Sequence, residues 1–138
     1  MSEAQDRNKA IIEEFRANGG VVGGFYADKT LLLLHTTGAK SGQERINPAV
    51  YIMDGERYVI IASKGGADTH PGWYHNLVAN PEVSVEVGTE KFEAIATVAE
   101  EPERTQLYEK MVEINSNFGE YPGMTARVIP VIILTRTE

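Results

Sequence analysis

The segment from Thr36 to Arg45 (TTGAKSGQER) carries the clearest chemical pattern in the chain. Two glycines bracket Lys40 and Ser41, and Arg45 follows the second glycine by three residues. Glycine lets the backbone N–H groups of a loop turn toward an anion. Lysine adds a point charge, and arginine adds a charge that can form two parallel hydrogen bonds to the anion. The segment is therefore a candidate cradle for a phosphate or a carboxylate. Its alternative interpretation is a surface hairpin loop with incidental charge.

This cradle resembles the phosphate loop of nucleotide hydrolases only superficially. The lysine follows Ala39, where that loop has a glycine. Pro48 also prevents the helix that should come next. Hydrolysis of nucleoside triphosphates is thereby excluded.

Two further segments place polar or aromatic side chains beside glycines. Ser63 and Lys64 stand where an apolar run opens into a pair of glycines, so they could face a planar or anionic ligand. The only tryptophan, Trp73, stands at the expected start of a short helix, and a helix N-terminus favours anions. The alternatives are a glycine-rich strand exit and a tryptophan that fills the core.

Metal and hydrolytic chemistry find little support. His35, His70 and His75 lack the i, i+4 spacing of helical metal ligands, and no carboxylate stands at a ligand-like offset. There is no Gly-x-Ser-x-Gly elbow of a serine hydrolase. Because the chain has no cysteine, disulfides, thiolate metal sites and cysteine nucleophiles are excluded. We expect no metal centre.

The charge is unevenly distributed along the chain. Thirteen basic and twenty acidic residues give a net charge of −7, yet residues 29–64 are net basic. An acidic exterior disfavours nucleic acid, whose binding depends on neutralising phosphates. A small basic island can instead concentrate a compact anionic ligand. Ordinary charge scatter is the alternative interpretation, and in either case we expect no nucleic-acid partner.

The length of 138 residues fits one compact domain. No window approaches the length of about 18 apolar residues that a membrane span needs, and the first 16 residues have no signal-peptide core. We therefore expect a cytoplasmic protein without membrane insertion. The mixed charge of the N-terminal segment favours packing on the domain over peripheral contact with a membrane.

Hydrophobic spacing predicts three helices, over 5–18, 73–79 and 102–114, and six strands, over 31–35, 47–53, 57–63, 82–87, 92–98 and 129–134. Asp54-Gly55 and Gly88-Thr89 predict tight hairpin turns. Six strands joined mostly by hairpins favour an antiparallel sheet curled into a small barrel, with about three helices packed outside. The expected fold class is α+β. Residues 1–26 should form a helix and a flexible glycine-rich connector, and 27–138 the barrel, within one structural domain.

Four motifs taken together resemble the deazaflavin-dependent nitroreductase family, also called deazaflavin-dependent quinone reductases. They read TTGAKSGQERINP, DGERYVIIASKGG, HPGWYHNLVANPEVSVEVG and TARVIPVIIL. Each motif is weak alone, but the four stand in the family's order and spacing over most of the chain. The resemblance implies a split β-barrel related to FMN-binding oxidases, with the deazaflavin coenzyme F-420 in place of FMN.

The resemblance also implies which residues bind this coenzyme. The phosphate and glutamate tail would be held by Ala39, Lys40, Ser41, Gly42 and Arg45. The ring would lie against Ile46, Asn47, Pro48, Ala49 and Val50, and against Ile61, Ala62, Ser63 and Lys64 on the next strand. Further contacts would come from Gly72, Trp73, Tyr74, His75, Asn76 and Phe118.

The chemistry that the resemblance implies is hydride transfer from the reduced coenzyme, so the protein needs no nucleophile. Its task is to place an electrophilic acceptor, exclude water and stabilise the developing negative charge. Ser63 is the candidate hydrogen-bond donor near the reacting ring edge. Tyr121 is the candidate proton donor, and solvent is the alternative donor.

The chain departs from relatives that reduce bulky nitroimidazoles. Those relatives carry several tyrosines before the last strand, whereas here Asn115 and Phe118 occupy two of these positions and only Tyr121 matches. Gly72 and Val50 stand where bulkier residues occur. These changes reshape the acceptor pocket and favour quinones, enones or coumarin-like lactones over nitroaromatic drugs.

Two other functions stay open at this point. Every motif concerns the holding of a coenzyme, so a non-catalytic F-420 carrier is one alternative. An FMN or haem binder on the same barrel is another. The expected partner is a small electrophilic acceptor, and the chain is expected to be a monomer or a homodimer.

Overall fold

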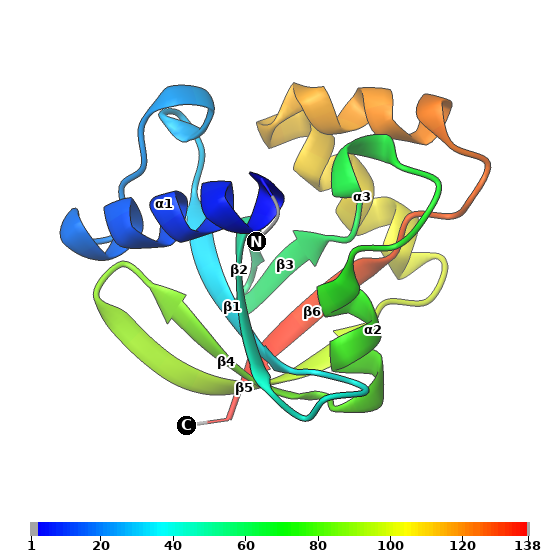
Figure 1. The fold of residues 1–138 in the computed structure, drawn as a ribbon. Coiled ribbons are helices and arrows are strands. Elements are labelled where there is room, and N and C mark those ends of the chain that lie inside the picture. The colour runs from blue at the N-terminus through cyan, green and yellow to red at the C-terminus, as the bar shows by residue number, and fades with distance from the viewer. Residues whose placement is uncertain (1–2, 138) are drawn as a thin grey trace.

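The computed structural model describes residues 3–137, and the side chains of these except residues 3–6 and 25. Within this range six strands form the centre and helices surround them (Figure 1). The strands are β1 (Leu31–Thr37), β2 (Glu44–Asp54), β3 (Arg57–Ile61), β4 (Glu82–Val87), β5 (Glu90–Val98) and β6 (Val131–Arg136). The α-helices are α1 (Glu3–Ala17), α2 (Gly72–Ala79) and α3 (Glu103–Ile114). Three 3-10 segments complete the order: η1 (Gly24–Tyr26), η2 (Lys64–Gly66) and η3 (Ser116–Met124).

The strands close into an antiparallel barrel in the order β1-β2-β3-β6-β5-β4. Strand β1 closes it, because Leu34 pairs with Asn47 of β2 on one side and with Val85 of β4 on the other. This confirms the expected α+β barrel with helices outside it. The ends of the two expected segments, residues 1, 2 and 138, lie outside the described residues.

Four consecutive leucines of β1 are buried because both faces of this strand are covered. Successive side chains of a strand point to opposite faces. Leu32 and Leu34 therefore join the barrel interior, while Leu31 and Leu33 pack outward beneath α1. There they meet Phe15 of α1, which is 1% exposed.

A second helical layer covers the outer face of β3 and β6. Val59 and Ile133 point outward and pack beneath Met111 of α3 in one buried cluster, which Phe118 of η3 joins. Val50 of β2 touches both this cluster and the one beneath α1. Strand β2 is therefore the part of the barrel wall where the two helical layers approach each other.

The predicted hairpins form where the turn residues indicated. The turn at Asp54-Gly55 joins β2 to β3 with Gly55 at φ +63°, and the turn at Gly88-Thr89 joins β4 to β5. The strand ends differ from the predicted ones, since β2 begins at Glu44 and β6 extends to Arg136. Partner strands cause both extensions, because Thr37 pairs with Glu44 and Ala94 with Arg136.

An ion-pair network fastens α1 to the barrel. Arg16 donates to the Glu86 carboxylate through Nη2 at 2.7 Å and Nε at 3.2 Å, and His35 Nε2 lies 2.5 Å from the same carboxylate. The hydrogen bond from Arg16, with a smaller contribution from His35, holds the pKa of Glu86 below its ordinary value. No helix among residues 3–137 is long and apolar enough to cross a bilayer.

Candidate active site

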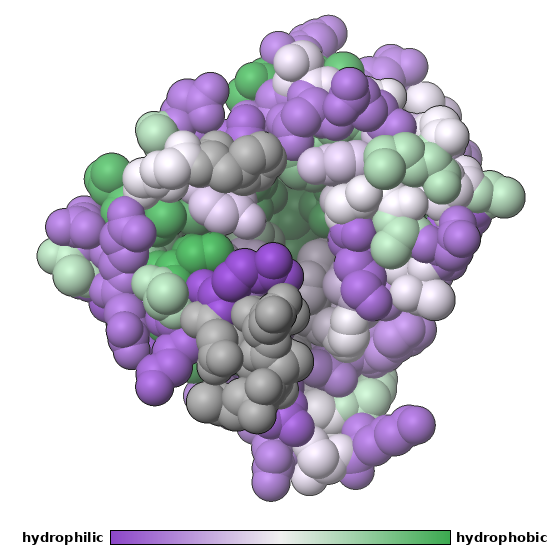
Figure 2. All heavy atoms as spheres, turned by 45° about the horizontal axis from the view of Figure 1, so that its top comes forward, coloured by the Kyte–Doolittle hydropathy of each residue, from purple (hydrophilic) through white to green (hydrophobic). Residues whose placement is uncertain are grey.

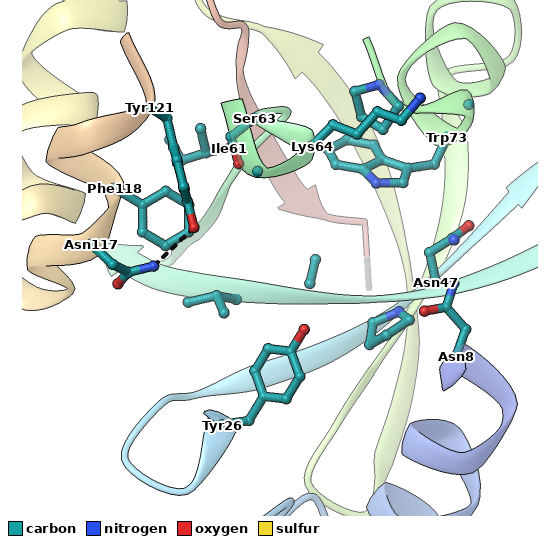
Figure 3. A pocket seen from close by; sticks show the side chains of 16 residues that line it. Asn8, Tyr26, Asn47, Ile61, Ser63, Lys64, Trp73, Asn117, Phe118 and Tyr121 are labelled. Carbon is teal, nitrogen blue, oxygen red and sulfur yellow. Dashed lines mark hydrogen bonds between the residues drawn. The ribbon is translucent and has the colours of Figure 1, made fainter. Parts of the chain in front are cut away.

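A cavity of about 450 Å³ opens beside β2, where the two helical layers approach each other. Figure 2 shows a hollow with an apolar floor on this side of the molecule, and Figure 3 shows its side chains. The wall combines apolar strand residues, aromatic rings and a few polar groups. Its lining residues are Asn8, Tyr26, Asn47, Pro48, Ala49, Val50, Ile61, Ser63, Lys64, Gly65, Pro71, Gly72, Trp73, Asn117, Phe118 and Tyr121.

This cavity adjoins two others, which share lining residues with it or with each other. A second space of about 720 Å³ beneath α1 shares Asn8, Asn47 and Trp73 with the first. A third of about 570 Å³ shares Arg45 and Asn76 with the second, and extends to Ala39, Lys40 and Ser41. We call the three together the long groove. It runs from a basic loop at one end to Ser63 and Tyr121 at the other.

The basic loop is held in shape by its own backbone. Gly38 N–H donates to the carbonyl of Gln43 at 2.8 Å, and Gly42 N–H donates back to the carbonyl of Gly38 at 3.0 Å. A Cβ on Gly38 would lie 2.5 Å from Ser41 Oγ and 3.2 Å from the carbonyl oxygen of Gln43, so a side chain there would force the Ser41 hydroxyl to turn away. The loop is therefore a tight turn that presents Lys40 and Ser41 to the groove.

Helix α2 fixes the same loop through one amide side chain. Asn76 Oδ1 accepts a hydrogen bond from the N–H of Ala39 at 2.9 Å, and its Nδ2 donates to Thr36 Oγ1 at 3.1 Å. Asn76 thus joins the end of β1, the basic loop and the groove wall. Its position supports a structural contribution to the loop in addition to any contact with a ligand.

Lys40 and Arg45 form no ion pair with a carboxylate of the described chain. Both side chains line the long groove. A basic side chain without an acidic neighbour keeps its charge available for an anionic ligand. The loop geometry and these two charges together make this end a site for a phosphate or carboxylates.

Ser63 lies at the opposite end of the long groove, where the chain leaves the barrel after β3. The residue is 7% exposed and lines the cavity, and its hydroxyl has no hydrogen-bond partner in the part of the chain that the structure describes. Lys64 follows with a left-handed backbone at φ +48°, and its Nζ donates to Thr69 Oγ1 at 3.3 Å. The Ser63 hydroxyl is therefore free to bind a group in the cavity.

Tyr121 reaches the cavity from η3. Its ring packs edge-on against Phe118 with centroids 5.3 Å apart, and its Oη accepts a hydrogen bond from Asn117 Nδ2 at 3.1 Å (Figure 3). Because Oη accepts this bond, the hydroxyl keeps its own hydrogen for another acceptor. Tyr26 of η1 lies across β2 from it and also points its hydroxyl toward the cavity (Figure 3).

Most of the residues singled out from the sequence line the long groove. The exceptions are Gly42, Ala62 and Tyr74. Ala62 is fully buried, and Tyr74 packs on the interior core and against the His70 ring, with centroids 4.5 Å apart. Gly42 serves the turn itself, at φ +70°.

The sequence analysis missed several lining residues. Asn8 of α1, Tyr26 of η1 and Asn117 of η3 all face the first cavity. Tyr26 had a signal, because it ends the glycine-rich connector whose flexibility allows it to fold back on the barrel. Asn8 and Asn117 had none, since only the docking of α1 and η3 brings them to the groove.

Metal chemistry has no visible site here. Among residues 3–137, no group of three or more histidine, cysteine, aspartate or glutamate side chains could hold a metal ion. The groups that the long groove does offer are cations at one end, hydroxyl and amide groups at the other, and apolar or aromatic walls between them. Such a site suits an elongated ligand with an acidic tail and a flat ring.

Comparison with known proteins agrees with this geometry. The family model described as "F420H(2)-dependent quinone reductase" matches residues 7–136. An F420H(2)-dependent quinone reductase of Mycobacterium tuberculosis is 46% identical over 108 residues, which cover 76% of this chain and 72% of that protein.

Two solved structures are also similar. One, an F420-H2 dependent reductase, is 40% identical with a TM-score of 0.69 and covers 75% of this chain and 92% of that one. The other, a domain-swapped dimer, is 35% identical with a TM-score of 0.71 and covers 95% of this chain and 96% of that one. The family model covers nearly all of the described residues, and the chain therefore belongs to the F420H(2)-dependent quinone reductase family.

Proposed function

We propose that this protein reduces quinones with reduced coenzyme F-420. The family and the relatives described above are named for this activity. The observation that carries the proposal is the long groove, whose adjoining cavities place two cations without acidic neighbours at one end and the Ser63 and Tyr121 hydroxyl groups at the other. A coenzyme bound along it would have its acidic tail at Lys40 and its ring at Ser63.

The residues present fit such a coenzyme. Lys40 and Arg45, with the Ser41 hydroxyl, offer charge and hydrogen bonds to a phosphate or carboxylates. Val50, Ile61 and Trp73 offer apolar surface to a planar ring. When bound in its reduced form, the deazaflavin supplies a hydride to the acceptor.

The protein's own contribution is to hold the acceptor and to manage its charge and proton. A quinone oxygen becomes negatively charged as the quinone gains a hydride, and donors already in place at that oxygen stabilise the charge. The Ser63 hydroxyl is one such donor, since no group of the described residues binds it. The Tyr121 hydroxyl is the second, and Asn117 holds it with its hydrogen free for transfer. One hydride and one proton complete the hydroquinone, and the tyrosine regains its proton from water.

The same arrangement extends to activated C=C bonds. An enone or a coumarin-like lactone carries a carbonyl oxygen that gains negative charge when hydride adds to the conjugated carbon. Such an oxygen would use the same hydroxyl donors. Nitroaromatic drugs remain less favoured, because only Tyr121 stands in the place of the several tyrosines of the relatives that reduce them.

The test is an assay of the purified protein with reduced F-420 and menadione. The return of the absorbance of oxidised F-420 on addition of menadione is the expected result, and a cyclic enone tests the extension. Tight F-420 binding without turnover on quinones, enones or nitroaromatics would instead identify a carrier. Parallel fluorescence titrations with F-420 and FMN decide the coenzyme, and tighter binding of FMN would contradict the proposal.

Organisation and location are proposals of the same kind. Packing of α1 on Leu31 and Leu33 supports one structural domain made of residues 1–26 and 27–138. For the assembly we propose a monomer or a homodimer, and the domain-swapped relative supports the dimer. Light scattering measures the assembly, and cell fractionation tests a cytoplasmic location.

A further inference from the structure

Three consecutive backbone amides beside the first cavity have no acceptor among the residues that the structure describes. Ser63 has a right-handed backbone at φ −79° and Lys64 a left-handed one at φ +48°. This alternation makes successive N–H groups converge on a concave site that suits a negatively charged oxygen. The N–H groups of Ser63, Lys64 and Gly65 donate to no acceptor among the described residues, and all three residues line the cavity.

The carbonyls of the same segment are held from behind by one side chain, that of Arg127. Its Nη1 donates to the carbonyl of Ala62 at 3.2 Å and its Nη2 to that of Ser63 at 2.8 Å. Its Nε donates to the carbonyl of Ala67 at 2.8 Å, and Nη1 also lies 2.9 Å from His70 Nδ1. Four of the five N–H groups of the guanidinium are thereby used.

Arg127 binds backbone carbonyls just beyond the end of the sheet, where no strand partner is available. The last β3–β6 backbone bond beyond the ladder runs from Ala62 N–H to the carbonyl of Pro130 at 2.9 Å. Beyond it the chain leaves the barrel, and buried carbonyls without a strand partner would destabilise the loop. Arg127 comes from the segment between η3 and β6, so it also ties the Ser63 segment to the segment that follows Tyr121.

Because the peptide bond is planar, holding these carbonyls in place also fixes the direction of the N–H groups in the same peptides. In a trans peptide the C=O and the next residue's N–H point in opposite directions. Fixing the carbonyls of Ala62 and Ser63 therefore fixes the N–H groups of Ser63 and Lys64 on the other side. Arg127 itself is absent from the lining of the cavity, whereas Ser63 and Lys64 form part of it.

We infer that Arg127 is a positioning residue that holds the N–H groups of Ser63 and Lys64 as hydrogen-bond donors to an oxygen of the ligand in this cavity. This role rests on the proposed function, because that oxygen belongs to the reacting quinone or to the ring beside it. Positioning errors of about 1 Å at a reacting group can cost about a hundredfold in rate. Removing the anchor should therefore affect turnover more than tail binding.

The test compares Arg127→Ala and Arg127→Lys with the control Arg104→Ala. Arg104 donates to the carbonyl of Ile129 at 2.9 Å, so its loss removes a similar bond from the same segment without touching the long groove. For Arg127→Ala we expect kcat with menadione to fall by about tenfold or more. The Kd for F-420 should change by less than the rate does, because Lys40 and Arg45 are intact. Lysine keeps the positive charge but lacks the planar set of N–H donors of arginine, so the rate of Arg127→Lys should stay close to that of Arg127→Ala. Added guanidinium ion should restore part of the rate of Arg127→Ala.

A second readout does not need turnover. Amide hydrogen exchange of Ala62, Gly66 and Ala67, whose N–H groups donate to the carbonyls of Pro130, Ser63 and Lys64, should become faster in Arg127→Ala than in Arg104→Ala, whether or not menadione is reduced. Unchanged exchange at these amides overturns the inference even if the wild type is an active reductase. Faster exchange with a wild-type protein that is inactive supports the anchoring and counts against the proposed function alone. Equal losses of rate in Arg127→Ala and Arg104→Ala would show that Arg127 only stabilises the fold.

Discussion

Lys40 and Arg45 differ from Arg16, Arg57 and Arg136 in lacking a carboxylate partner in the described chain. Arg16 binds Glu86, while Arg57 and Arg136 each bind a carboxylate at 2.9 Å. A basic side chain paired within the protein has part of its attraction for a ligand already satisfied. At the scale of single residues, this difference distinguishes the two cations of the long groove from basic side chains that only stabilise the surface.

We predict that Lys40→Ala and Arg45→Ala each raise the Kd for F-420 by about tenfold or more, the scale of one lost charge-assisted contact. Fluorescence titration measures the effect, and Lys91→Ala, an exposed lysine on β5, is the control. The loss should shrink at high salt, since screening weakens these contacts. Parent-like binding by both groove variants would show that the acidic tail lies elsewhere.

Ser63→Ala and Tyr121→Phe should lower kcat more than they weaken F-420 binding. Each removes one hydroxyl donor from the cavity, and loss of such a donor typically costs about a hundredfold in rate. Steady-state kinetics with menadione, beside a titration of F-420, separate the two effects. An unchanged rate in either variant removes that residue from the mechanism.

Sequence reasoning reached these residues unequally, for physical reasons. Lys40 lies in the turn between β1 and β2 and Arg45 at the start of β2, five positions later, so their common end of the groove follows from local spacing. Tyr74 was expected at the coenzyme because the family resemblance implies contacts from the whole segment 72–76, but the helix turns it inward onto the core. Arg127 could not be found, since its partners at Ala62 and Ser63 lie more than sixty positions away in the chain.

Among the elements, η2 and η3 must approach closely for the first cavity to have two walls. Gly66 permits this approach, because a Cβ there would lie 2.8 Å from Met124 Sδ, and its φ is +87°. Met124 ends η3, the element that carries Phe118 and Tyr121. The contact between a glycine and a methionine therefore sets the spacing of the cavity walls.

Gly66→Ala should destabilise the protein more than Gly65→Ala. Both glycines have positive φ, at +87° and +64°, so each variant carries the cost of a left-handed alanine, about 1–2 kcal/mol. A Cβ on Gly66 would also clash with the Met124 side chain, whereas nothing lies within 4 Å of a Cβ on Gly65. Urea unfolding of the two variants isolates the contact. Equal losses would mean that η3 moves aside freely.

The elements themselves were predictable wherever a local signal existed. Asp54-Gly55 and Gly88-Thr89 predicted both hairpins, and the buried run of β1 was visible as four leucines. The strand ends were not predictable from the sequence, because they depend on pairing with the neighbouring strand. No element was predicted between residues 114 and 129, yet η3 forms there, and its Phe118 is buried among residues of α3 and β6.

For the whole molecule, α1 has two functions at once. It covers the outer face of β1, and its Asn8, Lys9 and Ile12 line the second cavity of the long groove. Stability and the shape of the binding site are therefore linked through this helix. A change that loosens α1 should weaken both.

Phe15→Ala should lower the free energy of unfolding by about 3–5 kcal/mol, the usual cost of removing a buried phenylalanine. Its side chain is 1% exposed beneath α1. We also expect weaker F-420 binding, because the helix wall of the groove loses its anchor. Chemical denaturation and fluorescence titration measure the two effects, and unaltered binding in a destabilised variant would show that α1 contributes no wall to the bound coenzyme.

The Arg16–Glu86–His35 network should make stability depend on pH. The folded-state pKa of Glu86 lies below its ordinary value of 4.5, chiefly through Arg16. Its stabilisation is therefore complete above about pH 4.5 and is lost as the pH falls through the lower, folded-state value. Urea unfolding from neutral pH downward should show a steeper decline for the wild type than for Glu86→Gln. Parallel curves would show that the pair contributes nothing measurable.

The closed sheet also limits how this chain can associate. Every strand in the described part of the barrel has a hydrogen-bonded neighbour on each side. An open sheet edge is the usual template on which another polypeptide adds a strand. Here the pairing is incomplete, because residues 44–50 of β2 pair with β1 alone, whereas residues 51–54 pair with β3. Because Asn47, Pro48, Ala49 and Val50 of this stretch line the long groove, a ligand bound there would cover part of the edge that another polypeptide would need.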